Sequence, residues 1–280
     1  MLTVSSIEEL RKIRRELPEP VGFVPTMGFL HEGHLSLVRA AQKVCGSVVV
    51  SIYVNPTQFG PTEDLAKYPR DLARDESLLI GENVDVLWTP SDIIMYPPGY
   101  QTWVTVEKVT QVLEGAARPT HFRGVSTIVA KLFMCVQPQM AFFGQKDAQQ
   151  AVVLKKMAID LNFPIDMVIC PIAREPDGLA LSSRNVYLTD DQRRSAPVLH
   201  RSLLLAKKLY QKGERNAETI KAKMMELFDM EPQARVQYIS IADASTLEEV
   251  DQMNDSQILI SMAVYFGGTR LIDNILLPED

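Results

Sequence analysis

The chain alternates between short runs of apolar, often β-branched residues and longer segments whose apolar residues recur every three or four positions. The short runs predict buried strands and the longer segments predict helices packed against them. Strands are expected at 21–25, 47–54, 84–88, 140–143 and 165–169, and helices at 34–44, 69–80, 124–136 and 148–161. This alternation predicts an α/β domain, a parallel sheet with helices on both faces.

The two ends of the chain follow other patterns. Ser6 and Glu9 have the spacing of a helix capping box, and Pro18 and Pro20 end the helix that follows. After about residue 176, helices at 189–211 and 217–228 come before strands at 236–242, 257–264 and 271–277. Helices followed by strands favour a smaller α+β domain with an antiparallel sheet. We therefore expect one domain at 1–175 and a second at 176–280.

Composition narrows the class of protein. The 280 residues are 46% hydrophobic and 23% charged, with a net charge of −6, which is typical of a globular chain. An acidic balance argues against non-specific binding of nucleic acid, which needs a basic surface. No run is apolar enough to span a bilayer, and a polar N-terminal segment argues against a signal peptide. These features predict a cytoplasmic protein without nucleic-acid or membrane partners.

Two groups of side chains are interpreted as structural. Cys45, Cys135 and Cys170 lie in apolar surroundings without a Cys-x-x-Cys spacing, which predicts reduced thiols packed in a core. The basic residues of the first helix alternate with glutamates, which predicts a solvated helix face; they are Arg11, Lys12, Arg14 and Arg15.

The loop at 25–34, Pro-Thr-Met-Gly-Phe-Leu-His-Glu-Gly-His, is the most informative segment. It follows a predicted strand and leads into a helix, and Gly28 and Gly33 let the backbone approach a bulky anion. His31 and His34 could both donate to phosphate oxygens. A metal site and a plain turn with two surface histidines are the alternatives. The metal alternative lacks a third ligand and the zincin spacing, so phosphate binding is favoured.

Four further polar segments carry candidate chemistry. After the strand at 140–143, Gly144, Lys146 and Asp147 suit phosphate, ribose or magnesium, although Asp147 could simply cap a helix. The segment 181–185 contains two serines and an arginine, which are suited to a flexible loop that binds polyphosphate. The alternative is that the segment caps the N-terminus of the next helix. The segment 55–59 carries uncharged amide side chains that could bind the hydroxyls of a small polar substrate. Its Asn-Pro sequence is equally typical of a structural turn. Arg118 and 121–123 form a cationic loop or a solvated surface. Common hydrolase, P-loop and dinucleotide motifs are absent from the sequence.

Taken in order along the chain, five of these strings resemble the pantoate–β-alanine ligase family, the pantothenate synthetases. They are PTMGFLHEGH at 25–34, VNPTQFGPTEDLAKYPR at 54–70, LEGAARPTHFRGV at 113–125, FFGQKDAQQ at 142–150 and REPDGLALSSRN at 174–185. The His-x-Gly-His loop alone would indicate only the wider nucleotidyltransferase superfamily. Phe29 and Leu181 differ from the residues that are more common at these positions in the family. Neither position is a charged contact, so the differences concern the packing of the loops.

The resemblance implies a Rossmann-like N-terminal domain, a smaller C-terminal lid and a homodimer. It also implies that ATP, pantoate and β-alanine give pantothenate, AMP and pyrophosphate through a pantoyl-adenylate, with Mg²⁺ bound mainly through the ATP phosphates. Carried over by position, the implied ATP contacts are Met27, His31, His34, Gly144, Lys146, Asp147, Ala173, Ser182, Ser183 and Arg184. His34, His31 and Lys146 are the implied catalytic residues. The implied pantoate contacts are Gln58 and Gln150, with Asn55, Tyr68 and Arg118 nearby.

Two other functions remain open from the sequence. A nucleotidyltransferase of the same superfamily would leave the nucleotide on its product, whereas a ligase releases AMP when the amine is present. A non-catalytic nucleotide-binding protein is the third hypothesis, and the presence of His31, His34, Lys146 and Arg184 together argues against it. No residue in the sequence stands out as a base for the amine step.

Overall fold

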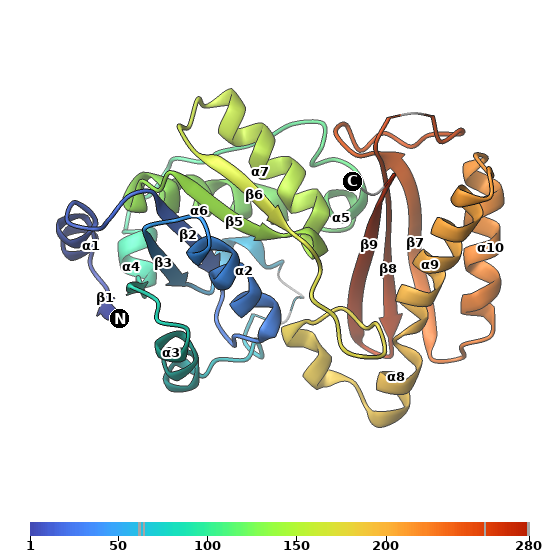
Figure 1. Ribbon diagram of the computed structural model, residues 1–280, viewed down its shortest axis with the longest axis horizontal. Coiled ribbons are helices and arrows are strands. Elements are labelled where there is room, and N and C mark those ends of the chain that lie inside the picture. Colours follow the sequence, from blue (N-terminus) through green and yellow to red (C-terminus); the bar gives the residue numbers. More distant parts are fainter. Residues whose placement is uncertain (61–62, 64, 255, 279–280) are drawn as a thin grey trace. The chain divides into compact units, whose positions relative to one another are not determined.

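The structure is a computed structural model that describes residues 1–60, 63, 65–254 and 256–278. The chain divides into two compact units. Unit 1 comprises Met1–Gln145 and Gln150–Pro171, and unit 2 comprises Lys146–Gln149 and Ile172–Asp280. Each unit has a sheet of its own (Figure 1).

Unit 1 is built on a six-stranded parallel sheet with the strand order β1-β4-β3-β2-β5-β6. Its strands are β1 (Leu2–Val4), β2 (Val21–Thr26), β3 (Ser47–Ile52), β4 (Val86–Trp88), β5 (Met140–Gly144) and β6 (Asp166–Cys170). The predicted parallel sheet is confirmed. The central strands are buried on both faces because their residues are apolar without alternation, as with Phe23 and Val24.

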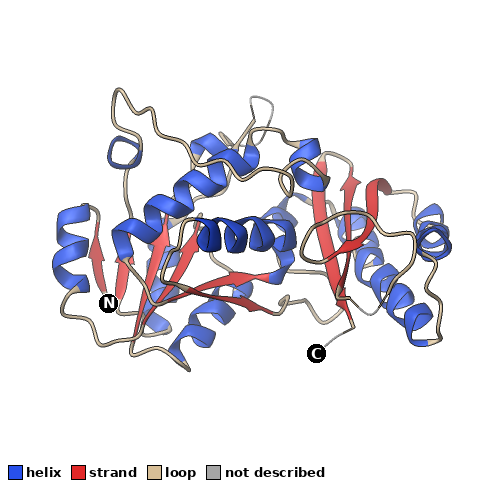
Figure 2. Ribbon diagram, turned by 90° about the horizontal axis from the view of Figure 1, so that it is seen from above, coloured by secondary structure: helices blue, strands red, loops and turns tan. Residues whose placement is uncertain are grey.

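Helices lie on both sides of this sheet (Figure 2). They are α1 (Ile7–Arg14), α2 (Glu32–Gln42), α3 (Leu72–Gly81), α4 (Asp92–Met95), α5 (Leu113–Ala117), α6 (His121–Val136) and α7 (Ala148–Asp160), with the 3₁₀ turns η1 (Pro56–Gln58) and η2 (Gln145–Asp147). The predicted capping box of Ser6 and Glu9 is present at α1. The apolar positions of α2, among them Leu35, Val38 and Ala41, are buried in the core against the sheet.

Arg14 differs from the expectation of a solvated helix face. Its side chain is buried, and its Nε donates to the carbonyl of Val136 at 3.1 Å while Nη2 donates to that of Gln137 at 2.9 Å. Helix α6 ends at these carbonyls, where unpaired C=O groups and the helix dipole favour a cation. The short elements β1, α4 and α5 were not predicted either, because three to five residues carry too little periodicity.

Unit 2 contains a three-stranded antiparallel sheet, which confirms the prediction for this part of the chain. Its elements are η3 (Ser183–Tyr187), α8 (Asp190–Ser195), α9 (Val198–Gln211), α10 (Ala217–Asp229), β7 (Ala234–Asp243), β8 (Ile258–Phe266) and β9 (Thr269–Leu277). Helices α9 and α10 lie along the sheet (Figure 1), and their apolar faces form one core with it. The single helix predicted at 189–211 is wrong: Pro197, which has no N–H to donate, separates α8 from α9.

The three thiols are core groups, as predicted. Cys135 and Cys170 are buried, Cys45 is partly buried, and none forms a disulfide. Burial raises the pKa of each thiol, which disfavours the reactive thiolate. In the described part of the chain, no helix is long and apolar enough to cross a membrane.

Candidate active site

The histidine loop leaves the carboxyl end of β2 and enters α2, with His31 as the residue that caps the helix. Nδ1 of His31 accepts from the Gly33 N–H at 3.1 Å, and Nδ1 of His34 accepts from the His31 N–H at 3.3 Å. The two ring centroids are 4.1 Å apart. Because both Nδ1 atoms accept, both neutral rings carry their proton on Nε2. Two imidazole donors thus stand together at a helix N-terminus, where the backbone also favours an anion.

A buried carboxylate from α3 holds this loop in place. Asp75 is 1% exposed, and its two oxygens accept from the backbone N–H groups of Phe29 and Leu30, each at 2.7 Å. Burial raises the pKa of Asp75, while these two hydrogen bonds and the nearby Arg74 act in the opposite direction. The carboxylate therefore fixes the backbone immediately before the histidines.

The loop also depends on an unusual backbone conformation. Gly28 has φ +78° and Phe29 has φ +50°, both in the left-handed region. A Cβ on Gly28 would lie 3.0 Å from Ile52 and 3.1 Å from the Asp75 carboxylate. A side chain at position 28 would therefore strain the backbone and push against the Ile52 side chain and the carboxylate that holds the loop.

Gln58 lies at the end of η1, on a framework formed by Asn55. Asn55 is 1% exposed, and its Nδ2 donates to Gln58 Oε1 and to the Gly124 carbonyl, each at 3.2 Å. Its Oδ1 accepts from the Thr57 hydroxyl at 3.0 Å and from the Tyr96 hydroxyl at 3.0 Å. The polar atoms of Asn55 are therefore engaged within the protein, and the residue orients the Gln58 amide.

Close packing of α6 against η1 completes this framework. A Cβ on Gly124 would lie 2.5 Å from the carbonyl oxygen of Thr57. Only glycine allows this approach without a backbone shift. The Gln58 amide reaches the histidine loop, because its Nε2 lies 2.9 Å from the sulfur of Met27.

His121 and Arg118 anchor the backbone of Gln58. Nδ1–H of His121 donates to the Gln58 carbonyl at 2.9 Å, and Arg118 Nη1 donates to His121 Nε2 at 3.2 Å. Burial lowers the pKa of His121 to about 4, and the guanidinium acts in the same direction. His121 is thus neutral at pH 7 and adds no positive charge to this loop, whereas Arg123 is exposed.

The charge of Arg118 is paired within the protein. Its guanidinium forms an ion pair with Glu63, with Nε donating to Oε1 at 2.7 Å. Burial is the largest single influence and raises the pKa of Glu63, but the hydrogen bond and charge of Arg118, with smaller contributions from His121 and the Gly60 backbone, together hold that pKa below its ordinary value. Residues 61, 62 and 64 of the motif at 54–70 lie outside the described residues.

In unit 2, Lys146 is fixed through its backbone. Its carbonyl accepts from Nδ2 of Asn274 in β9 at 3.0 Å. The neighbouring Asp273 is 2% exposed and forms a two-pronged ion pair with Arg174, at 2.7 and 2.9 Å. Strand β9 therefore holds both the segment of Lys146 and the segment that begins at Arg174.

The other candidate nucleotide residues lie at ends of elements. Ser182 accepts from the Arg184 N–H at 3.2 Å and caps the turn η3, so the capping alternative for this serine is realised. Ser183 is buried, and the carbonyl of Ala173 accepts from the Leu181 N–H at 2.9 Å. Asp147 is exposed just before α7.

Gly144, Gln150 and Tyr68 complete the candidate set. Gly144 ends β5, and a Cβ on it would meet no atom within 4 Å, so no packing requirement of the protein accounts for this glycine. Gln150 is partly buried in the first turn of α7. Tyr68 is buried with its ring edge against Phe59, at a centroid distance of 5.7 Å.

Hydrogen bonds and close contacts connect four of the predicted pantoate and ATP residues within unit 1: Met27, Gln58, Asn55 and Arg118. Three supporting residues were not predicted, namely Asp75, Asn274 and the neutral His121. No local sequence signal identifies the first two, because each acts on a segment far away in the chain. In the described residues, no three His, Cys, Asp or Glu side chains form a group that could hold a metal ion.

A parallel sheet with a donor-rich loop at its carboxyl edge defines an α/β protein of the kind that binds small ligands at that edge. The comparison with known proteins is more specific. The model of the pantoate-beta-alanine ligase family matches residues 2–276, and the chain belongs to this family.

Relatives and solved structures agree with that assignment. The chain is 53% identical to a pantothenate synthetase of Roseiflexus castenholzii, over 99% of each chain. It is 54% identical to that of Chloroflexus aggregans, over 99% of this chain and 100% of the relative. A crystal structure of the pantothenate synthetase of Thermus thermophilus superposes with a TM-score of 0.92 at 47% identity, covering 98% of this chain and 99% of the other.

A more distant structure was solved with ligands. The pantoate-beta-alanine ligase of Francisella tularensis, complexed with "Beta-gamma ATP" and β-alanine, superposes with a TM-score of 0.80 at 34% identity. The match covers 100% of this chain and 99% of the other. The protein is thus an enzyme of the carbon–nitrogen ligase class.

Proposed function

We propose that this chain condenses pantoate with β-alanine to pantothenate at the expense of ATP, through a pantoyl-adenylate, and releases AMP and pyrophosphate. The observation that carries the proposal is the His31–His34 pair at the N-terminus of α2, in which each Nδ1 accepts from a backbone N–H, in a chain of this family.

The first step needs no general base, because the pantoate carboxylate is ionised at neutral pH. A carboxylate oxygen attacks the α-phosphorus of ATP, a P–O bond forms, and the bond to the β-phosphate breaks to release pyrophosphate. The main obstacle to this attack is repulsion between the carboxylate and the negatively charged phosphates. Hydrogen-bond donors fixed in the site lower the activation barrier by stabilising that charge. His34 and His31 donate to the phosphates, and Lys146 adds a positive charge.

The remaining ATP contacts are proposed from their positions in the family motifs: Met27, Gly144, Asp147, Ala173, Ser182, Ser183 and Arg184. The open space over Gly144 supports close approach of a nucleotide to its backbone. Mg²⁺, held by ATP phosphate oxygens, would neutralise part of the triphosphate charge. The described residues fit this mode, since Mg²⁺ bound through substrate phosphates needs few protein ligands, of which the exposed Asp147 is one candidate.

Gln58 and Gln150 are proposed to hold the hydroxyls and carboxylate of pantoate. Asn55 acts through Gln58, because its amide already bonds Gln58 and the Gly124 carbonyl. Tyr68 and Arg118 line the same region, and Arg118 also orients the Gln58 backbone. In the second step, the neutral amine of β-alanine attacks the acyl carbon and AMP leaves with one former carboxylate oxygen.

The domain boundary at 175/176, the role of 176–280 as a lid, the homodimer and the cytoplasmic location are proposed on the resemblance to the family. Exclusion of water from the adenylate would be the purpose of a lid.

The test is AMP release from ATP and Mg²⁺ with pantoate and β-alanine, omitting each component in turn. The proposal expects AMP only when both organic substrates are present, and pantoate-dependent ATP–pyrophosphate exchange without the amine. His34→Ala should lower exchange by about 10²–10³-fold, as expected for loss of a donor to developing charge. A nucleotide retained on the product would favour a nucleotidyltransferase, and ATP binding without either reaction would favour a non-catalytic protein.

A further inference from the structure

The side-chain amide of Gln58 is almost buried, and its two polar atoms meet different surroundings. Gln58 is 8% exposed, and its Oε1 accepts from Nδ2 of Asn55 at 3.2 Å. In the part of the chain that the structure describes, Nε2 meets only the sulfur of Met27, at 2.9 Å. A thioether is a weak acceptor, so this NH₂ group has no oxygen partner there. Because buried donors are nearly always paired, the group is suited to an acceptor oxygen on a ligand.

The orientation of the Gln58 amide depends on Asn55. Nδ2 of Asn55 donates to Gln58 Oε1 and to the Gly124 carbonyl, while its Oδ1 accepts from the Tyr96 hydroxyl at 3.0 Å. If the Asn55 amide turned over, its oxygen would oppose the Gly124 carbonyl and its NH₂ group would oppose the backbone N–H of Thr57. The donors to Oδ1 therefore keep the NH₂ group of Asn55 toward Gln58, which leaves the Gln58 NH₂ group on the opposite side.

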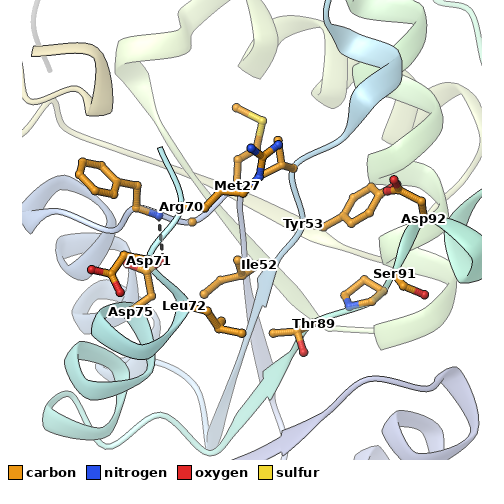
Figure 3. Close-up of a pocket in the computed structure, with 14 residues that line it drawn as sticks. Met27, Ile52, Tyr53, Arg70, Asp71, Leu72, Asp75, Thr89, Ser91 and Asp92 are labelled. Atoms are coloured by element: carbon orange, nitrogen blue, oxygen red, sulfur yellow. Dashed lines mark hydrogen bonds between the residues drawn. The ribbon is translucent and has the colours of Figure 1, made fainter. Parts of the chain in front are cut away.

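Tyr96 follows α4, and α4 is anchored at the carboxyl end of β3. The hydroxyl of Tyr53, the residue after β3, donates to Oδ1 of Asp92 at 2.9 Å, and Figure 3 shows the Tyr53 ring directed toward this carboxylate. The Tyr96 N–H donates to the carbonyl of Asp92 at 2.6 Å, and Met95 is fully buried. The backbone that carries Tyr96 is therefore held against the sheet.

The Tyr96 ring is held by two aromatic side chains and a lysine. Trp103 stacks on it at a centroid distance of 6.1 Å, and the Tyr100 ring meets it edge-on at 5.0 Å. Nζ of Lys131 lies 5.3 Å from the ring centroid. Burial raises the pKa of Tyr96 to about 12, so the hydroxyl keeps its proton at neutral pH. A phenylalanine at position 96 would keep these ring contacts and lose only the hydroxyl.

We propose that Tyr96 is a positioning residue for the acid substrate: its hydroxyl, acting through Asn55, fixes Gln58 so that the NH₂ group donates to a substrate oxygen. The inference rests on the proposed function, because it extends the pantoate contact assigned to Gln58. It makes Gln58 selective for a carboxylate or hydroxyl oxygen that accepts a hydrogen bond. Tyr96 acts through two hydrogen bonds and needs no contact with the substrate.

The test of Tyr96 is Tyr96→Phe, assayed by pantoate-dependent ATP–pyrophosphate exchange. Loss of one hydrogen bond from the chain should raise the KM for pantoate by about 3–10-fold, with the KM for ATP within about twofold of the unchanged protein. Tyr100→Phe is the matched control, since Tyr100 contacts the same ring and, among the described residues, its hydroxyl does not bond Asn55. It should leave both KM values unchanged.

Variants of Gln58 show whether Tyr96 acts through this residue. In Gln58→Ala, adding Tyr96→Phe should change the KM for pantoate by less than about twofold, because the side chain that Tyr96 positions is already missing. Gln58→Glu has nearly the same shape but presents an acceptor in place of the NH₂ group. Its exchange rate should therefore fall at least about tenfold below that of Gln58→Ala.

A spectroscopic measurement tests the same chain of hydrogen bonds without substrate. In ¹⁵N-labelled protein, the side-chain NH₂ resonances of Gln58 are identified by their loss in Gln58→Ala. They should shift in Tyr96→Phe and keep their positions in Tyr100→Phe. A general loosening of the aromatic cluster would shift them in both variants.

Each outcome bears on the proposal. An unchanged KM for pantoate or unchanged Gln58 resonances in Tyr96→Phe would overturn it. Equal effects of Tyr96→Phe with and without the Gln58 side chain would overturn it too, as would faster exchange in Gln58→Glu than in Gln58→Ala. If the unchanged protein shows no pantoate-dependent exchange but the Gln58 resonances shift only in Tyr96→Phe, the positioning of Gln58 is supported and the proposed function is contradicted.

Discussion

The buried carboxylate of Asp75 provides the sharpest test of how the histidine loop is held. Asn has nearly the same shape as Asp, but one of its two polar atoms is a donor. In Asp75→Asn, one of the two 2.7 Å bonds from the backbone N–H groups of Phe29 and Leu30 is therefore lost. The side-chain NH₂ group of the asparagine then faces a backbone N–H, so two donors oppose each other. Water cannot accept from them, because the residue is only 1% exposed.

The size of the effect follows from these contacts. A hydrogen bond to a charged group stabilises a protein by about 1.5–3 kcal/mol, and a buried donor left unpaired costs about 1–3 kcal/mol. Phe29 must also keep its left-handed backbone at φ +50°, a conformation unfavourable by about 1–2 kcal/mol for a non-glycine residue. We expect Asp75→Asn to lower the free energy of unfolding by about 2–4 kcal/mol. A shift of the histidines by about 1 Å would lower exchange by about 10²-fold.

Urea unfolding and pantoate-dependent ATP–pyrophosphate exchange measure the two effects. Asp85→Asn is the control, because Oδ2 of Asp85 also accepts from a backbone N–H, that of Val48 at 2.7 Å, but in an exposed residue away from the loop. It should cost about 1 kcal/mol or less and leave exchange unchanged. Asp75→Asn with wild-type stability and exchange would refute the role of this carboxylate.

Three further predictions concern supporting residues. Gly124→Ala should destabilise the protein by about 1–3 kcal/mol and raise the KM for pantoate, because its Cβ would lie 2.5 Å from the Thr57 carbonyl; an unchanged KM would contradict this. Since the pKa of His121 is lowered from 6.5 to about 4 in the folded protein, stability should fall as pH drops from 6.5 to 4. The loss should reach about 3 kcal/mol, and His121→Gln should remove it; urea midpoints with parallel pH dependence in both proteins would refute it. Asp273→Asn should cost about 3–5 kcal/mol by breaking a buried ion pair, and Asp177→Asn, at an exposed pair with Arg193, at most about 1 kcal/mol; thermal unfolding that affects both variants equally would contradict the difference.

The sheet could be predicted because its strands are locally distinctive. Residues 47–54 are almost wholly apolar and β-branched, and such a run is stable only when both faces are covered, as β3 is. The position of the loop at 25–34, between a strand and a helix, could also be predicted, and its glycines and histidines are the basis on which anion binding is proposed. Those signals lie within ten residues of one another.

The supports of the site depend on distant residues and were not predictable from local patterns. Asp75 is one acidic residue of a polar helix segment, and only the fold brings it to the backbone of Phe29 and Leu30. The neutral state of His121 likewise depends on burial, whereas its sequence neighbours suggested a cationic loop. The local sequence pattern thus indicated the chemistry proposed for the loop. Tertiary packing determines the protonation of His121 and the backbone geometry of the loop.

The central claim is that the pantoate carboxylate is activated as an adenylate. The direct measurement is a reaction of pantoate labelled with ¹⁸O in its carboxylate, followed by mass spectrometry of the AMP and pyrophosphate. Attack on the α-phosphorus transfers one carboxylate oxygen to AMP for each pantothenate formed, so we expect the label in AMP and none in pyrophosphate. AMP without the label would contradict an adenylate intermediate and the phosphate role assigned to His31 and His34.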